Sequence, residues 1–128
     1  MKIQPLNIDS KKKYILVYTI CFIVMAFAAS LPWIVTGTSF VWKIDGQGQH
    51  YPALVYLGQT LREFFVGVFS GHPKWNMWDL NIGFGSDVVG TLNYYCIGDP
   101  LDLLSVFVPK AYTEYLYEFL IIFRMYLA

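Results

Sequence analysis

Charged side chains are scarce in this sequence. They make up 14% of its 128 residues, against about 25% in an ordinary soluble domain. Hydrophobic residues make up 56% and aromatic residues 19%. This composition excludes an ordinary soluble domain and predicts a protein of the membrane.

Motifs of soluble enzymes are absent as well. The sequence has no Gly-rich phosphate loop, no serine or cysteine nucleophile motif, no zinc-ligand spacing and no tandem repeat. A soluble nucleotide-sugar enzyme is therefore unsupported. Of the two cysteines, Cys21 lies in an apolar run and Cys96 far from it, so we predict that both are free. They leave the redox compartment open.

The charges that are present are unevenly distributed. Residues 1–13, a basic tail, hold four lysines and one aspartate, a net charge of +3, whereas residues 36–110 hold four basic and six acidic residues, a net charge of −2. The positive-inside rule therefore predicts a cytoplasmic N-terminus and an extracytoplasmic loop over 36–110. The formal net charge of the chain is zero. We expect the lipid bilayer as a partner and no nucleic acid.

Residues 14–35 carry no charge and predict a transmembrane helix. About 22 residues of helix span about 33 Å, against about 30 Å of hydrocarbon, and Trp33 would lie at the outer interface. A cleaved signal peptide is the alternative, because Ala26 and Ala28 offer a cleavage site after the basic residues. The apolar run continues beyond Ala28, which favours the span.

Residues 52–69 predict an amphipathic helix. Six apolar side chains recur at helical spacing, with Arg62 and Glu63 expected on a solvated face; the apolar positions are Leu54, Leu57, Leu61, Phe64, Phe65 and Val68. The apolar face could cover a soluble core or lie in the membrane interface. The nearby span favours the interface.

The remaining segments predict an all-α membrane protein. Residues 74–93 mix aromatic, polar and glycine residues without a period, which predicts an ordered, irregular loop. Asp99 and Pro100 predict the N-cap and first turn of a short helix. Residues 111–128 predict the start of a second transmembrane helix, which Arg124 interrupts. We therefore expect a fragment of a longer, multi-pass protein.

The segment Trp42–Pro52, WKIDGQGQHYP, holds the main candidate for chemistry. Gly46 and Gly48 follow Asp45 and allow a ligand to approach closely, and a carboxylate at the membrane edge could take a proton from an acceptor hydroxyl. The alternative is an aspartate that caps a turn before Gly46. His50 could neutralise a phosphate, or bind a divalent cation together with Asp45. Two ligands are too few to predict a metal site, so the cofactor stays unknown.

Other candidates lie farther along the chain. Asp87 and Asp99 are carboxylates in Gly-rich settings, and the N-cap already explains Asp99. Tyr94 and Tyr95, together with Trp75 and Trp78, are either residues of an interfacial aromatic belt or a stacking surface for a sugar.

Three segments together resemble one family. SFVWKIDGQGQHYP, SGHPKWNMWDLNIGFGSD and TLNYYCIGDPLDLLSVFVPK, within residues 36–110, resemble in order and spacing the N-terminal region of the YfhO family of bacterial membrane proteins. That resemblance implies a polytopic glycosyltransferase of the GT-C type. It would move a sugar from a polyprenyl-phosphate carrier to a cell-envelope polymer such as lipoteichoic acid.

The resemblance also implies roles for residues. GT-C enzymes carry an acidic residue in the first extracytoplasmic loop, and Asp45 matches it as the catalytic residue. His50, Asp87 and Asp99 fall in matching motifs and, with Tyr94 and Tyr95, are expected to bind substrate. The chain stops near the second span, so we expect it to be inactive alone. The alternative function is a non-catalytic membrane protein whose loop is a binding or assembly module.

Overall fold

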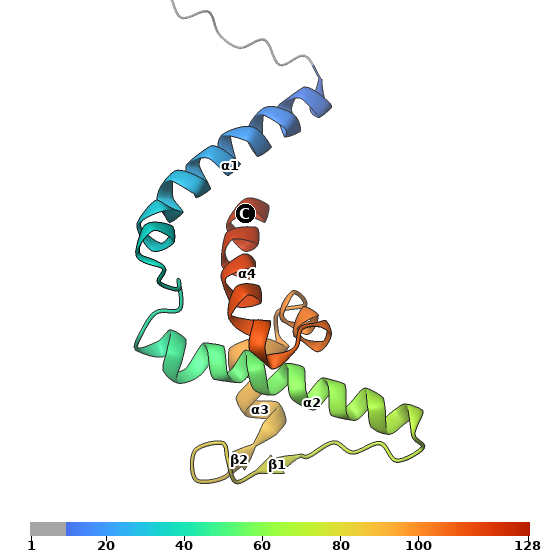
Figure 1. Cartoon of the computed structure of the whole chain (residues 1–128). Helices are drawn as coiled ribbons and strands as arrows, with labels where there is room; N and C mark the ends of the chain where they lie inside the picture. The colour runs from blue at the N-terminus through green and yellow to red at the C-terminus, as the bar shows by residue number, and fades with distance from the viewer. Residues whose placement is uncertain (1–9) are drawn as a thin grey trace, which may run out of the picture. The chain divides into compact units, whose positions relative to one another are not determined.

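Helices dominate the computed structural model, which describes residues 10–128 (Figure 1). This confirms the prediction of an all-α chain with a long apolar N-terminal helix. The part of residues 1–13 before Ser10 lies outside the described residues. In chain order the elements are α1 (Lys11–Thr36), the π-helical η1 (Gly46–His50), α2 (Tyr51–Phe69), β1 (Trp78–Asp79), β2 (Ser86–Asp87), α3 (Val88–Leu92), the π-helical η2 (Asn93–Ile97), the 3-10 helices η3 (Asp102–Phe107) and η4 (Lys110–Tyr112), and α4 (Thr113–Leu127).

The chain forms two compact units. The first combines α1 with residues 122–128, and the second comprises residues 39–121. Within the first unit, the Tyr126 hydroxyl lies 2.8 Å from the Thr19 hydroxyl, and the Tyr18 hydroxyl donates to the Tyr126 carbonyl oxygen at 2.7 Å. These contacts join α1 to the last turn of α4.

Helix α1 extends over the segment predicted to span the membrane. It is 26 residues long and none of its residues is buried, and among residues 10–128 it is the helix long and apolar enough to cross a bilayer. It ends at Gly37, whose φ of 63° is the left-handed conformation that glycine adopts without strain. The Thr38 N–H then donates to the Trp33 carbonyl oxygen at 3.1 Å.

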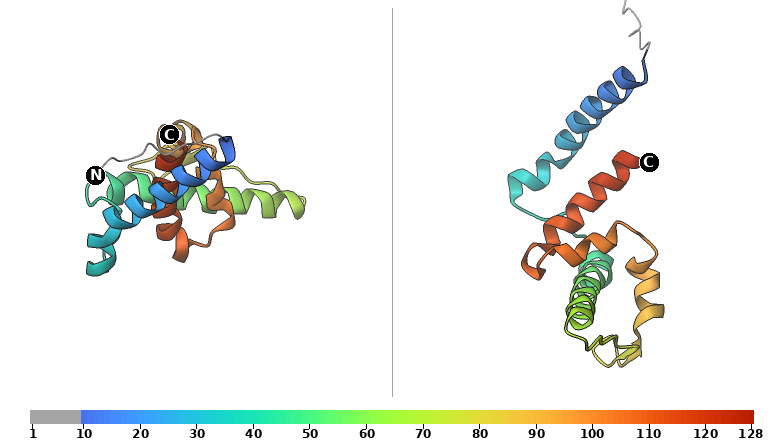
Figure 2. Two further views of the ribbon diagram at one scale, coloured as in Figure 1. Left: turned by 90° about the horizontal axis from the view of Figure 1, so that it is seen from above. Right: turned by 90° about the vertical axis from the view of Figure 1, so that its right-hand side faces the viewer.

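Helix α2 is the centre of the second unit (Figure 2, right, looks along it). It confirms the helix predicted over residues 52–69 and buries Leu54, Leu57 and Gly58. One side packs against α3 and η2 to form the core of Leu57, Val88, Leu92 and Cys96. Both cysteines are free, as predicted. Burial, with a smaller contribution from the nearby Asp102 carboxylate, raises the pKa of the Cys96 thiol to about 12.

The other side of α2 packs closely against η3. A Cβ at Gly58 would lie 2.7 Å from the Ser105 carbonyl oxygen, so this contact requires glycine. One turn later, Arg62 Nη1 donates to the carbonyl oxygens of Ser105 at 2.8 Å and Val108 at 2.7 Å. The prediction of a solvated Arg62 is therefore wrong: the half-buried guanidinium caps the end of η3, whereas Glu63 is exposed.

Two local predictions need correction. Residues 74–93 are not wholly irregular, because β1 and β2 form an antiparallel pair with Trp78 opposite Asp87 and Asp79 opposite Ser86. Strands of two residues are too short to show an alternating pattern. The Asp99 carboxylate does accept a hydrogen bond from the Leu101 N–H at 2.8 Å, but the helix begins only at Asp102 and is a 3-10 helix.

Helix α4 occupies the segment predicted as the start of a second span. It contains Glu114 near its beginning and Arg124 in its last turn. Glu118, in the second unit, accepts a hydrogen bond from the Phe40 N–H at 3.0 Å. This bond ties the chain segment before η1 to α4 within the second unit. The assignment of α4 to a membrane span stays a prediction.

Candidate functional site

Asp45 lies at the beginning of a helical segment that runs through η1 into α2. Its backbone is helical, with φ −74° and ψ −32°, and its side chain caps nothing. The alternative of a turn-capping aspartate is therefore wrong. The carboxylate is half-buried and makes no hydrogen bond or ion pair with any residue of the described chain, 10–128. Its oxygens are available to a ligand.

Buried Gly46 fixes this segment against the residues before it. A Cβ at Gly46 would lie 3.3 Å from Trp42 Cβ and 3.4 Å from the Val41 carbonyl carbon. The Gln47 N–H donates to the Trp42 carbonyl oxygen at 2.8 Å, so the helical hydrogen bonding already begins there. A larger residue here would require the neighbouring atoms to shift by a few tenths of an ångström.

A cavity of about 310 Å³ lies beside the start of α2. Its walls come from η1, α2, the loop between β1 and β2, α3 and η2, and none of the described residues that line it is charged. The lining residues are Gly48, Gln49, Pro52, Ala53, Tyr56, Asn81, Ile82, Gly83, Thr91, Leu92 and Tyr95.

A polar network joins α2 to the loop at one wall of this cavity. The Tyr56 hydroxyl donates to Asp79 Oδ2 at 2.6 Å. Asp79 Oδ1 accepts from the Asn81 N–H at 2.8 Å and from Asn81 Nδ2 at 2.9 Å. Burial, together with the bond to Asp79, raises the pKa of Tyr56 to about 12. The hydrogen bond from Tyr56, followed by those from Asn81, lowers the pKa of the Asp79 carboxyl.

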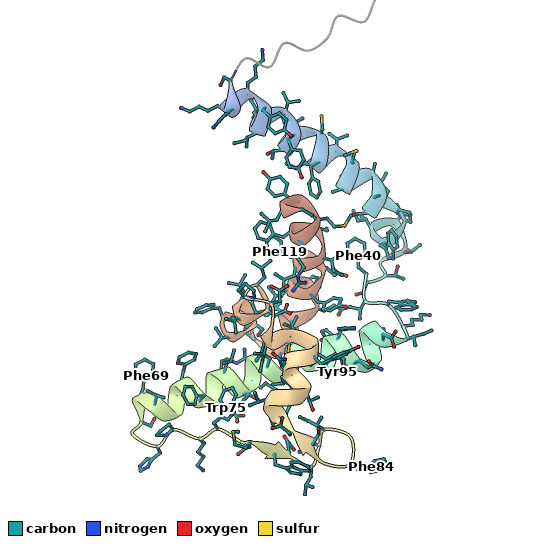
Figure 3. All side chains as sticks on the ribbon, turned by 180° about the vertical axis from the view of Figure 1, so that it is seen from behind. Phe40, Phe69, Trp75, Phe84, Tyr95 and Phe119 are labelled. Atoms are coloured by element: carbon teal, nitrogen blue, oxygen red, sulfur yellow. The ribbon has the colours of Figure 1, made fainter. Side chains whose placement is uncertain are left out.

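Three of the predicted site residues meet beside the cavity. Tyr95 hydrogen-bonds Gln49 Oε1 at 3.1 Å, and its ring packs edge-on against His50 at 5.4 Å and Tyr94 at 4.9 Å between centroids. Figure 3 shows Tyr95 beside the first turns of α2. Tyr95 lines the cavity, whereas His50 and Tyr94 are exposed beside it.

The predicted stacking surface of four aromatic residues is not assembled. Trp75 packs against Phe64 with ring centroids 5.6 Å apart, and neither residue lines the cavity. Trp78 is exposed in β1. Only Tyr95 of the four therefore faces the cavity.

The structure gives local roles to Asp87 and Asp99. Asp87 is the N-cap of α3, and its Oδ2 accepts a hydrogen bond from the Gly90 N–H at 2.5 Å. Asp99 accepts from the Leu101 N–H. Neither residue lines the cavity, and substrate binding by either stays a prediction.

Comparison with known proteins identifies the family. The model of the family described as "Bacterial membrane protein YfhO" matches residues 15–128. The chain belongs to the YfhO family. No curated protein and no solved structure matches it. Membership in the YfhO family and the apolar α1 together assign the protein to the bacterial membrane, and the orientation and number of spans stay predictions.

Sequence reasoning missed several residues of the cavity in this YfhO chain. Tyr56 lies 23 residues before Asp79, and no pattern signals that pair. Tyr56 does follow Pro52 and Ala53 at helical spacing, so the helix face could have indicated it. Among the described residues, no group of three or more metal-ligating side chains is close enough to hold an ion. The alternative of a cation bound by Asp45 and His50 thus gains no third ligand from the His, Cys, Asp and Glu side chains of residues 10–128.

Proposed function

We propose that this chain is the N-terminal part of a membrane glycosyltransferase that moves a sugar from a polyprenyl-phosphate carrier to a cell-envelope polymer such as lipoteichoic acid. The observation that carries this proposal is the half-buried Asp45 carboxylate, which has no partner among the described residues and begins the helical segment that lines the cavity. YfhO membership supports the membrane setting.

Asp45 is connected to the cavity through the helical segment that it begins. Asp45 precedes the lining residues Gly48 and Gln49 by three and four positions. η1 is π-helical, and a π-helical turn takes more than four residues, so Asp45 lies about one turn before Gln49. The carboxylate is therefore expected on the same side of the segment as Gln49, which lines the cavity.

An inverting displacement uses this carboxylate as a base. Asp45 takes the proton from the acceptor hydroxyl as the hydroxyl oxygen bonds to the anomeric carbon. The bond from that carbon to the phosphate oxygen breaks, and the phosphate leaves with the electron pair. His50, exposed five residues after Asp45, stabilises the leaving phosphate by hydrogen bonding.

The short segment 37–44 connects α1 to Asp45. With α1 spanning the bilayer, the connection keeps the carboxylate within about 30 Å of the end of α1. This range includes the headgroup level at which a carrier lipid presents its phosphate. The proposed reaction therefore needs no soluble donor.

Substitution of Asp45 tests the proposal. Asp45→Asn keeps the side chain's shape but removes the base, so polymer glycosylation in cells that express the intact protein should fall at least 100-fold, the order of a general-base contribution. Mass spectrometry of the extracted polymer measures this loss, and immunoblots of membranes check the protein level.

The exposed Glu63 of α2 supplies the matched control, since Glu63→Gln removes a carboxylate that does not line the cavity. It should leave glycosylation unchanged. Full glycosylation with Asp45→Asn would remove Asp45 from the mechanism and favour the binding or assembly module.

A further inference from the structure

We infer that the cavity beside α2 binds a single neutral pyranose ring, with Tyr56 and Asn81 holding its hydroxyls and Tyr95 contacting its C–H face. The ligand class rests on the proposed function. The placement of the ring rests on the residues of the cavity alone.

The size and charge of the cavity favour one uncharged ring. Its volume of about 310 Å³ is at the lower end of the range for ligand pockets, about 300 to 1,000 Å³. No lining residue of the described chain carries a positive charge, and the nearby Asp79 is anionic. A phosphate in this cavity would meet repulsion without a compensating cation.

The polar wall offers hydrogen bonds of the kind that sugar hydroxyls need. Tyr56 donates its only proton to Asp79, and its oxygen, which already interacts with the Thr60 side chain, has one further lone pair to accept a bond. Asn81 uses one side-chain N–H on Asp79 and keeps its second N–H and its carbonyl oxygen. Donors and acceptors side by side match hydroxyls, which both donate and accept.

Other lining residues offer an apolar surface. Tyr95 lies there with its hydroxyl fixed on Gln49, which holds the ring in place. Ile82 and Leu92 line the same cavity. Such a wall suits the C–H face of a pyranose ring, because an aromatic ring presents an electron-rich face to it.

Binding of simple glycosides to the intact protein in detergent micelles tests this inference. Methyl β-glucopyranoside and N-acetylglucosamine, followed by saturation-transfer NMR, should bind the unmodified protein. Tyr56→Phe and Asn81→Ala should each weaken that binding about tenfold, the loss expected when a hydrogen bond to the ligand is removed. Tyr112→Phe removes an exposed phenol away from the cavity and should change nothing.

Glycerol 3-phosphate serves as the negatively charged control ligand. It should not compete with the glycosides. Failure of both glycosides to bind, equal binding by Tyr56→Phe and Asn81→Ala, or competition by glycerol 3-phosphate would overturn the inference.

Transfer kinetics in vesicles that contain a polyprenyl-phosphate sugar show whether the sugar ring bound in the cavity belongs to the donor or to the acceptor. Tyr56→Phe should raise the half-saturating concentration of the carrier lipid if the bound ring belongs to the donor, and that of the polymer if it belongs to the acceptor. Unchanged half-saturating concentrations of both the carrier lipid and the polymer would contradict sugar binding in the cavity.

The catalytic role of Asp45 and the sugar site in the cavity can be refuted independently of each other. Asp45→Asn should abolish transfer and still bind the glycosides, because Asp45 does not line the cavity. If Asp45→Asn transfers sugar at the full rate while Tyr56→Phe binds glycosides poorly, the proposed mechanism is refuted and the sugar site is retained. Loss of transfer by Asp45→Asn, with normal glycoside binding by Tyr56→Phe, would refute the sugar site alone.

Discussion

Tyr56 and Asp79 illustrate what single residues contribute to this protein. Their 2.6 Å hydrogen bond links α2 to the end of β1. It favours a neutral phenol beside an ionised carboxylate, so the pKa of Tyr56 rises and that of Asp79 falls. Each shift makes the stability of the second unit depend on pH.

The Tyr56 shift predicts a loss of stability at alkaline pH. A tyrosine in the unfolded chain gives up its proton near the ordinary pKa of 10.0, while folded Tyr56 keeps it to about 12. The stabilisation is therefore complete below pH 10 and is lost as the pH rises from 10 to about 12. Between pH 10 and pH 12 the melting temperature in detergent should decrease less for Tyr56→Phe than for the unmodified protein. Equal decreases in melting temperature would contradict the raised pKa of Tyr56.

Residues of this kind were the least predictable from the sequence. The bonds of Arg62 reach carbonyl oxygens more than 40 positions away, and Asp79 stands in a segment without a period. Helical spacing alone put Arg62 on a solvated face. Its burial follows from Gly58, one turn earlier, which lets η3 approach α2 closely.

Elements were predictable where they are long and periodic. The charge-free run predicted α1 and the spacing of leucines predicted α2, each within a few residues of the observed ends. The two-residue strands β1 and β2 depend on pairing across a loop, so they carry no sequence signal of their own. The start of η3 at Asp102, after the turn capped by Asp99, also depends on packing against α2.

The beginning of α3 provides a test at this scale. Asp87→Ala removes the side-chain acceptor for the Gly90 N–H and should destabilise the second unit by about 1 kcal/mol. Hydrogen exchange of residues 88–92 should accelerate correspondingly. Asp87→Asn preserves an oxygen acceptor and should retain most of the stability. A loss of glycosylation by Asp87→Asn at normal stability would instead support the predicted role in substrate binding.

For the whole molecule, the distribution of charge predicts an orientation that labelling can check. Phe84 is fully exposed in the loop between β1 and β2, at its outer tip (Figure 3), and Lys12 lies in the first turn of α1. With both native cysteines replaced, Phe84→Cys in intact cells should react with a membrane-impermeant maleimide. Lys12→Cys should react only after the cells are permeabilised. The reverse pattern would invert the predicted topology.

The uncharged lining of the cavity has a consequence for the proposed sugar site. Association of a neutral ring with neutral walls displaces no counterions, and screening by salt does not weaken it. Occupancy of the proposed site would therefore depend on the concentration of the sugar and not on the ionic strength around the protein.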